Sequence, residues 1–164
     1  MKEIQLVFFR HGIADPNVTP DHERPLTDEG IKKTRAAAEG LRKLEIPFDK
    51  ILTSPWRRAA QTASILADVL MTGAPEELPE LAGNRSVKEL FDALSRRKPG
   101  NVLLVGHQPL LGAAVAHLLG AGDKCEVDLR KSGACAIQVE SLPSRKPAIL
   151  EWLLTSKQLR AFGK

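Results

Sequence analysis

A short apolar run near the N-terminus constrains the fold of this chain more than any other feature. Residues 4–9 read IQLVFF, and Gln5 is their one polar member. Because successive side chains of a strand point to opposite faces, such a run predicts a strand that is buried on both faces. A strand of this kind belongs in the interior of a sheet whose two faces are covered by helices.

The rest of the chain alternates between candidate helices and further candidate strands. Helical spacing of apolar residues follows Thr27, a predicted N-cap with Asp28 and Glu29 in the first turn, and this helix is expected to end before Pro47. Further helices are expected from Ser54-Pro55 to about Leu70, over 87–95, over 109–119 and from 156 onward. Further strands are expected over 48–53, 101–105, 134–140 and 149–153, with an irregular loop over 73–83.

This alternation predicts a three-layer α/β/α sandwich with a mainly parallel central sheet. At 164 residues the chain is long enough for one domain with its own core, so we expect a single domain over residues 1–164. Internal repeats, low-complexity tracts and linkers are not recognisable in the sequence.

Composition and charge narrow the class of ligand. The net charge is +4 and the pI about 9.2, values that suit a nucleic acid, an anionic small molecule or a phosphoprotein as partner. Tyrosine is absent and aromatic residues make up 4% of the chain, which disfavours platforms for stacking nucleic-acid bases. The charge therefore favours a phosphate ligand and disfavours nucleic acid.

Other common classes of protein also fit the sequence poorly. The longest apolar stretch, residues 110–121, is interrupted by His117 and is too short for a membrane span; without a recognisable signal peptide, we expect a cytoplasmic protein that does not bind membranes. Cys125 and Cys135 form no CxxC motif, and the four histidines lack HxH or HxxxH spacing, so neither a disulfide framework nor a metal site is expected. A GxxxxGK[ST] phosphate-binding loop is also missing.

Three of the expected strands are followed at once by basic or nucleophilic residues. Arg10 and His11 follow the first, the segment 54–58 (SPWRR) follows the second, and Gly106-His107 follows the strand at 101–105. Ligands of open α/β sheets bind at the carboxyl ends of the strands, so these groups are expected to converge. Arginine forks match phosphate oxygens, and a neutral imidazole can attack phosphorus, so the set suits phosphoryl transfer.

Four segments extend this interpretation to a known family. They resemble the RHG, RPLTxxG, SPxxRAxQTA and VGHxP motifs of the histidine phosphatase superfamily, the phosphoglycerate mutase-like proteins, and the second is typical of its short SixA-type branch. An RHG tripeptide alone is weak support, whereas four motifs in the family's order are highly specific. The matching segments are 6–12 (LVFFRHG), 24–30 (RPLTDEG), 54–63 (SPWRRAAQTA) and 105–109 (VGHQP).

The resemblance implies roles for individual residues and a reaction without a cofactor. His11 would be the nucleophile and would form a transient phosphohistidine. Arg10 and Arg58 would clamp the phosphoryl oxygens, and His107 would stabilise the transferring group. Arg24 would line the substrate pocket, whereas Arg57 is expected to point away from it.

The chain departs from the larger members of the superfamily, which carry a capping insertion and a carboxylate that acts as general acid. It has no room for a cap domain, and Glu80 is the nearest acid by position, with Glu77 a weaker candidate. An imidazole leaves phosphorus more easily than an alkoxide does, so a missing acid and an open cleft favour phosphohistidine on another protein. The resemblance to the SixA-type branch implies a histidine-containing phosphotransfer protein as partner, and we expect the enzyme itself to be a monomer.

Three alternatives remain open at this stage. A phosphatase for small phosphate esters would use Glu80 as its acid, and a non-catalytic module would bind phosphate or a phosphoprotein without turnover. Nucleic-acid binding rests on the pI alone. His22, in a charged loop, and His117, on an apolar helix, are interpreted as structural residues.

Overall fold

The apolar run at the N-terminus forms an interior strand of a six-stranded sheet. The computed structural model describes residues 3–164, and in it β1 (Ile4–Arg10) pairs with β4 (Val102–Gly106) on one side and with β5 (Ala134–Val139) on the other. The four residues from Leu6 to Phe9 are fully buried. The prediction of a strand buried on both faces is confirmed.

The sheet has the order β3-β2-β4-β1-β5-β6, and three of its five strand pairings are parallel. The parallel part contains β1 and β4 together with β2 (Lys50–Thr53) and β3 (Glu76–Glu77). The antiparallel edge consists of β5 and β6 (Ile149–Leu154). This arrangement is the expected mainly parallel sheet.

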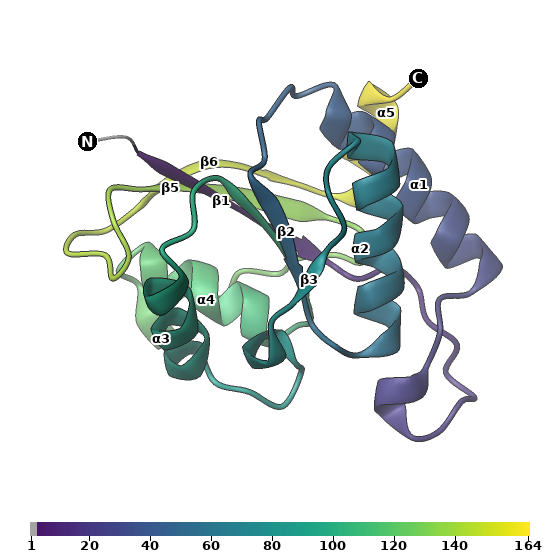
Figure 1. Ribbon diagram of the computed structural model, residues 1–164, viewed down its shortest axis with the longest axis horizontal. Coiled ribbons are helices and arrows are strands. Elements are labelled where there is room, and N and C mark those ends of the chain that lie inside the picture. Colours follow the sequence, from purple (N-terminus) through teal and green to yellow (C-terminus); the bar gives the residue numbers. More distant parts are fainter. Residues whose placement is uncertain (1–2) are drawn as a thin grey trace.

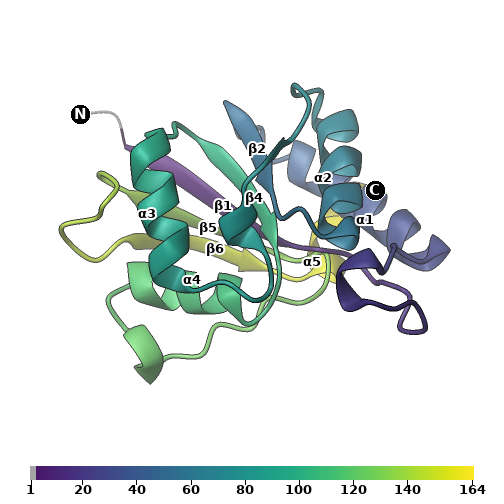
Figure 2. The ribbon, with the colours of Figure 1, turned by 60° about the horizontal axis from the view of Figure 1, so that its bottom comes forward.

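Helices cover both faces of the sheet, as Figures 1 and 2 show. The side chains of β1 alternate between two cores: Leu6 and Phe8 face α3 and α4, whereas Val7 and Phe9 face α1, α2 and α5. The three-layer α/β/α sandwich is therefore present, and residues 3–164 form no additional cap domain. The helices are α1 (Asp28–Arg42), α2 (Arg57–Leu70), α3 (Val87–Arg97), α4 (Leu110–Leu118) and α5 (Ser156–Phe162).

Two local expectations need correction. Helix α2 begins at Arg57 with Trp56 as its N-cap, so Pro55 precedes the helix and does not occupy its first turn. The segment 73–83, expected to be irregular, contains β3 and a short 3₁₀-helix at Pro79–Leu81. Strand β3 carries two exposed glutamates and is held by backbone pairing to β2, so it leaves no apolar pattern in the sequence.

The register of the sheet brings three chain segments to one edge. Arg10 pairs with Gly106, and Thr53 pairs with Val105, so β1, β2 and β4 end side by side. The residues that follow these strands therefore become spatial neighbours although up to 96 positions separate His11 from His107. No helix within residues 3–164 is both long and apolar enough to cross a membrane.

Candidate active site

The backbone around His11 is fixed by hydrogen bonds from both neighbouring strands. The amide of His11 donates to the carbonyl of Gly106 at 3.0 Å, and that of Arg10 donates to Gly133 at 3.1 Å. The amide of Ser132 donates to the carbonyl of Arg10 at 3.1 Å. Ser132 has a φ of 56°, in the left-handed region that non-glycine residues seldom adopt, so the loop that supports His11 is held in a strained conformation.

Gly12 allows the chain to leave the strand through a crowded space. Its amide donates to Thr62 Oγ1 at 3.1 Å, which ties the turn to helix α2. A Cβ atom at Gly12 would lie 2.3 Å from Thr34 Oγ1, far inside van der Waals contact. The glycine therefore lets helices α1 and α2 approach the turn that carries His11.

The structure brings five of the predicted residues into one cleft of about 360 Å³ at the carboxyl ends of β1, β2 and β4. Arg10, His11, Arg58, His107 and Arg24 all line it. The other lining residues are Ala14, Asp21, Trp56, Gly83, Gln108 and Lys131. The convergence expected from strand ends is thus present.

The imidazole of His11 is oriented by the carbonyl of its neighbour. Nδ1 lies 2.7 Å from the oxygen of Gly12, and since a carbonyl only accepts, Nδ1 carries the proton. Nε2 is then the unprotonated nitrogen, and its lone pair accepts a hydrogen bond of 3.2 Å from Arg58 Nε. Burial, reinforced by the charges of Arg58, Arg10 and Lys131, lowers the pKa of His11 to about 3, so the ring is neutral at physiological pH.

His107 lies opposite, with its ring centre 5.1 Å from that of His11. Its Nε2 is 2.8 Å from Ser54 Oγ, and its ring is 4.8 Å from that of Trp56. Burial lowers the pKa of His107 to about 3, so this ring is neutral as well. Its Nδ1 is buried without a hydrogen-bond partner in residues 3–164, a situation that concentrates at functional sites.

Arg58 is oriented by a loop that lies above the cleft. Its Nη1 donates to the carbonyl of Asp21 at 2.8 Å, and its Nη2 is 3.1 Å from the Asp21 carboxylate. Arg24 Nη1 donates to the other oxygen of that carboxylate at 3.0 Å. The hydrogen bond from Arg24, with those from Arg58, lowers the pKa of Asp21, so this carboxyl group is ionised at neutral pH.

Arg10 lines the cleft from the carboxyl end of β1. Its Nη1 donates to the carbonyl of Leu129 at 2.9 Å, which fixes the plane of the guanidinium. Burial lowers the pKa of Arg10 while the nearby Asp128 counteracts this, but an arginine remains a cation in a protein. The guanidiniums of Arg10, Arg24 and Arg58 and two neutral imidazoles therefore line a space suited to a phosphoryl group.

The structure separates several other candidates from the cleft. Glu80, in the 3₁₀-helix at 79–81, is not among the lining residues, and its carboxylate lies 4.0 Å from Arg85. Glu77 is exposed on β3. Arg57 is exposed, which agrees with its expected outward direction.

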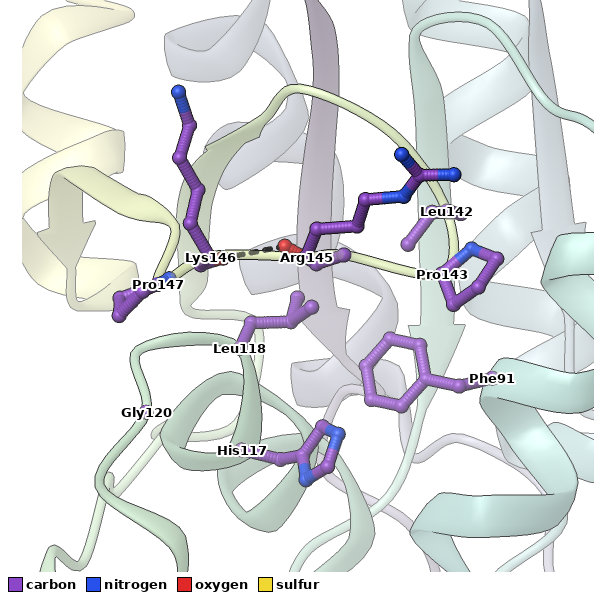
Figure 3. Close-up of a pocket in the computed structure, with 10 residues that line it drawn as sticks. Phe91, His117, Leu118, Gly120, Leu142, Pro143, Arg145, Lys146 and Pro147 are labelled. Carbon is purple, nitrogen blue, oxygen red and sulfur yellow. Dashed lines mark hydrogen bonds between the residues drawn. The ribbon is translucent and has the colours of Figure 1, made fainter.

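A separate hollow, shown in Figure 3, lies at the end of the sheet opposite the cleft. Its rim includes the loop that follows β5, whose last residue, Val139, pairs with Ile4 at the start of β1. His117 stacks there on Phe91, with ring centres 5.3 Å apart, so it packs as expected for a structural residue. This hollow contains none of the groups predicted to act on phosphate.

Sequence reasoning missed four residues that line or support the cleft: Asp21, Ser54, Trp56 and Lys131. Ser54 and Trp56 belong to a motif that was recognised, so their positions in it were the available signal. Asp21 begins the short 3₁₀-helix Asp21–Glu23, and only tertiary folding brings it to Arg58. Within residues 3–164, no group of three or more histidine, cysteine, aspartate or glutamate side chains could hold a metal ion.

Comparisons with known proteins place these features in context. The family model of the histidine phosphatase superfamily (branch 1) matches residues 6–83. The phosphohistidine phosphatase SixA of Escherichia coli K12 is 34% identical over 119 residues, which are 70% of this chain and 74% of that protein. An uncharacterized protein of Picosynechococcus is 35% identical over 140 residues, 82% of this chain and 85% of its own length.

Solved structures show the same architecture. The protein histidine phosphatase SixA complexed with tungstate has a TM-score of 0.84 and 27% identity, with 95% of this chain and 99% of that chain covered. A mycobacterial glucosyl-3-phosphoglycerate phosphatase has a TM-score of 0.73 at 18% identity, with 94% and 100% covered, which shows a shared fold alone.

Proposed function

The chain belongs to the histidine phosphatase superfamily and its short SixA-type branch, and we propose that it hydrolyses a phosphohistidine carried on another protein through a phospho-His11 intermediate. That it is a phosphatase follows from the family; the substrate and the intermediate are the proposal. The observation that carries them is a neutral His11 whose unprotonated Nε2 contacts Arg58 in a cleft that Arg10 and His107 also line.

In the first step, Nε2 of His11 attacks phosphorus and the N–P bond of the substrate breaks. The substrate imidazole takes up a proton and leaves neutral, while His11 becomes positively charged. The carbonyl of Gly12 accepts the Nδ1 hydrogen bond at 2.7 Å and so stabilises the imidazolium. Water then attacks phosphorus, the bond to Nε2 breaks, and inorganic phosphate is released. Arg10 and Arg58 bind the equatorial oxygens throughout. The neutral ring of His107 donates to them from Nδ1 while its Nε2 accepts a hydrogen bond from Ser54 Oγ.

The lack of a protonated acid in the cleft favours imidazole as the leaving group. Asp21 is the one carboxylate among the lining residues, and its lowered pKa keeps it ionised and unable to donate a proton near pH 7. An alkoxide leaving group needs such a donor, whereas an imidazole accepts its proton from water or buffer more readily. The charge distribution therefore supports phosphohistidine over an alkyl phosphate ester.

The access to the cleft also supports a protein substrate. The fold has no cap domain above the carboxyl ends of β1, β2 and β4, so His11 can be reached by a side chain that projects from another protein. A histidine-containing phosphotransfer domain, encountered in the cytoplasm by a monomer of this enzyme, is the partner that we propose. The name of the Escherichia coli relative, a phosphohistidine phosphatase, agrees with this substrate class.

Phosphate release from a phosphohistidyl phosphotransfer protein and from an aryl phosphate tests the proposal. Wild type is expected to turn over the protein rapidly, and His11→Ala is expected to abolish the reaction with both substrates. Acid-labile phosphate trapped on wild type, and missing from His11→Ala, would identify the intermediate. Cleavage of the aryl phosphate alone would move the substrate to small esters, and activity that survives His11→Ala would refute the mechanism.

Glu80 distinguishes the ester phosphatase from the proposed function. If Glu80 were the general acid, Glu80→Gln would remove the limb of the pH–rate profile that depends on a protonated acid. Because Glu80 lies beside Arg85 and outside the cleft lining, we expect the profile of Glu80→Gln to match that of wild type. A module that binds phosphate without turnover would show phosphate binding and no hydrolysis of either substrate.

A further inference from the structure

A second cavity, of about 430 Å³, lies directly beside the phosphate cleft. Arg10 and Lys131 line both cavities, so one wall is shared. The second cavity extends from this wall toward α1 and α5, which lie next to each other in Figures 1 and 2. It is lined by Arg10, Ile13, Lys33, Arg130, Lys131, Ser132, Ser156 and Arg160.

The charge of this second cavity is of one sign. Five of its lining side chains are cationic and none is a carboxylate. Two acidic residues approach from outside: Glu29 pairs with Lys33 at 2.6 Å, and Asp128 pairs with Arg130 at 3.1 Å. All four of these side chains are at least 39% exposed, so the pairs are weak and readily exchanged for another anion.

The remaining polar groups of the cavity have few partners of their own. Arg160 and Lys131 form no ion pair within residues 3–164. The Nε of Arg160 and the Oγ of Ser156 are shielded from solvent, and neither has a hydrogen-bond partner among the described residues 3–164. A cluster of five cationic side chains, in which Lys131 and Arg160 have no ion-pair partner among the described residues, favours an anion supplied from outside.

From this geometry we propose a second anion-binding site, centred on Lys33 and Arg160, that takes a carboxylate of the phosphohistidyl protein while its phosphoryl group occupies the cleft of His11. The inference rests on the proposed function for its choice of partner. The shared wall sets the reach: an acidic side chain next to the phosphohistidine on the substrate surface occupies the second cavity at the same time. Substrates with one anionic group use the first cleft alone.

A carboxylate is the occupant that we favour over a second phosphate, because the five cationic side chains come from four separate segments, which suits the acidic surface of a protein. A small molecule with two phosphates would offer the same oxyanion chemistry. Two comparisons of kcat/KM distinguish these occupants. The first compares phosphohistidyl peptides that carry glutamate or glutamine beside the histidine. The second compares a linear alkane bisphosphate with the corresponding monophosphate.

The test uses Lys33→Gln, Arg160→Gln and the double variant, because these two residues line the second cavity and not the first. The measured quantity is the ratio of kcat/KM for the phosphohistidyl protein to kcat/KM for an aryl phosphate. Removal of one charge is expected to lower this ratio about tenfold at low salt, with a smaller loss at high salt. Arg160→Lys, which keeps the charge, is expected to retain most of the ratio.

Arg145→Gln is the matched control. It removes the same charge from an exposed arginine at the hollow of Figure 3, at the end of the sheet opposite the cleft, and is expected to leave the ratio as in wild type. An unchanged ratio in the double variant would overturn the proposal. The carboxylate would be overturned as occupant if kcat/KM were higher for the bisphosphate than for the monophosphate only when Arg160 is present, while the glutamate and glutamine peptides reacted equally well.

A binding measurement keeps the second site testable even if phosphohistidyl proteins are not substrates. Inorganic phosphate is titrated into the full chain while backbone amide resonances are followed by NMR. We expect two groups of shifts with separate affinities, one at Gly12 and His107 and one at Lys33, Ser156 and Arg160. The second group is expected to vanish in Arg160→Gln, and a single group confined to the first cleft would refute the site.

Discussion

The two buried histidines make the stability of the folded chain depend on pH in a way that can be calculated. His11 is 6% exposed and His107 2% exposed, and each has its pKa lowered to about 3 in the folded chain. In the unfolded chain an imidazole has a pKa of about 6.5. Between these pKa values the unfolded chain binds more protons than the folded chain. The two histidines therefore contribute their full share of the free energy of unfolding above pH 6.5, and this contribution falls as the pH falls.

The magnitude follows from these values. Between pH 7 and pH 5, each histidine is expected to reduce the free energy of unfolding by about 2 kcal/mol. The same loss applies for any folded pKa below about 4, because the buried ring is then unprotonated at pH 5. Loss from both histidines is a large share of the roughly 5–15 kcal/mol that stabilises a domain.

The assay is urea unfolding at pH 7 and pH 5 in buffers without phosphate, since a bound anion would stabilise the folded chain. Wild type is compared with His107→Asn, and the loss between the two pH values is the quantity of interest. We expect the loss to be about 2 kcal/mol smaller in His107→Asn, because one buried imidazole has been removed. His22→Asn, which removes an exposed imidazole, is the matched control and is expected to keep the full loss.

Equal losses in wild type and His107→Asn would refute the reasoning. That result would mean that His107 is protonated at pH 5 in the folded chain, or that its burial does not persist in solution. Direct titration of the imidazole resonances by NMR would then distinguish these two explanations. His11→Asn gives an independent repetition of the same comparison.

Three substitutions test the geometry of the cleft more directly. Arg58→Lys is expected to lower kcat/KM by about 10²-fold through loss of the guanidinium fork, whereas Arg57→Lys, one position away and exposed, should match wild type in the same phosphate-release assay. Gly12→Ala is expected to destabilise the fold by about 1–3 kcal/mol in urea unfolding, because its Cβ meets a side-chain oxygen at 2.3 Å; Gly73→Ala, with nothing within 4 Å, should cost little. Ser54→Ala should cost about 1–3 kcal/mol by the same measurement and also lower kcat, since it leaves a buried imidazole nitrogen unpaired; unchanged stability and activity would contradict that role.

Much of the architecture could be predicted because local patterns agree with the tertiary fold. The run at residues 4–9 is apolar at nearly every position because both faces of β1 are buried, and Thr27 caps α1 through its hydroxyl at 2.9 Å from the amide of Gly30. Strand β3 was missed because its two exposed glutamates are ordered by pairing with Leu52 and Thr53, and edge pairing of this kind needs no apolar residue.

The candidate site shows the same division between local and distant information. Arg10, His11, Arg58 and His107 stand in recognisable motifs at the ends of strands or the start of a helix, so their convergence could be expected. Asp21 could not be connected to Arg58 in this way, because a loop without periodicity gives no indication of where it returns to the fold. Glu80 was proposed from its position in the chain, which does not show that its carboxylate lies near Arg85 and outside the cleft lining.

The sequence by itself determined the layered α/β architecture, the family and the set of groups that meet at the carboxyl ends of β1, β2 and β4. These features follow from periodicity and from motifs, which are properties of neighbouring residues. Only the tertiary structure decided that Nε2 of His11 carries the lone pair, that burial keeps both imidazoles neutral, and that a second cationic cavity adjoins the first. Protonation and charge depend on which groups surround an atom in space, and the folded chain alone establishes those surroundings.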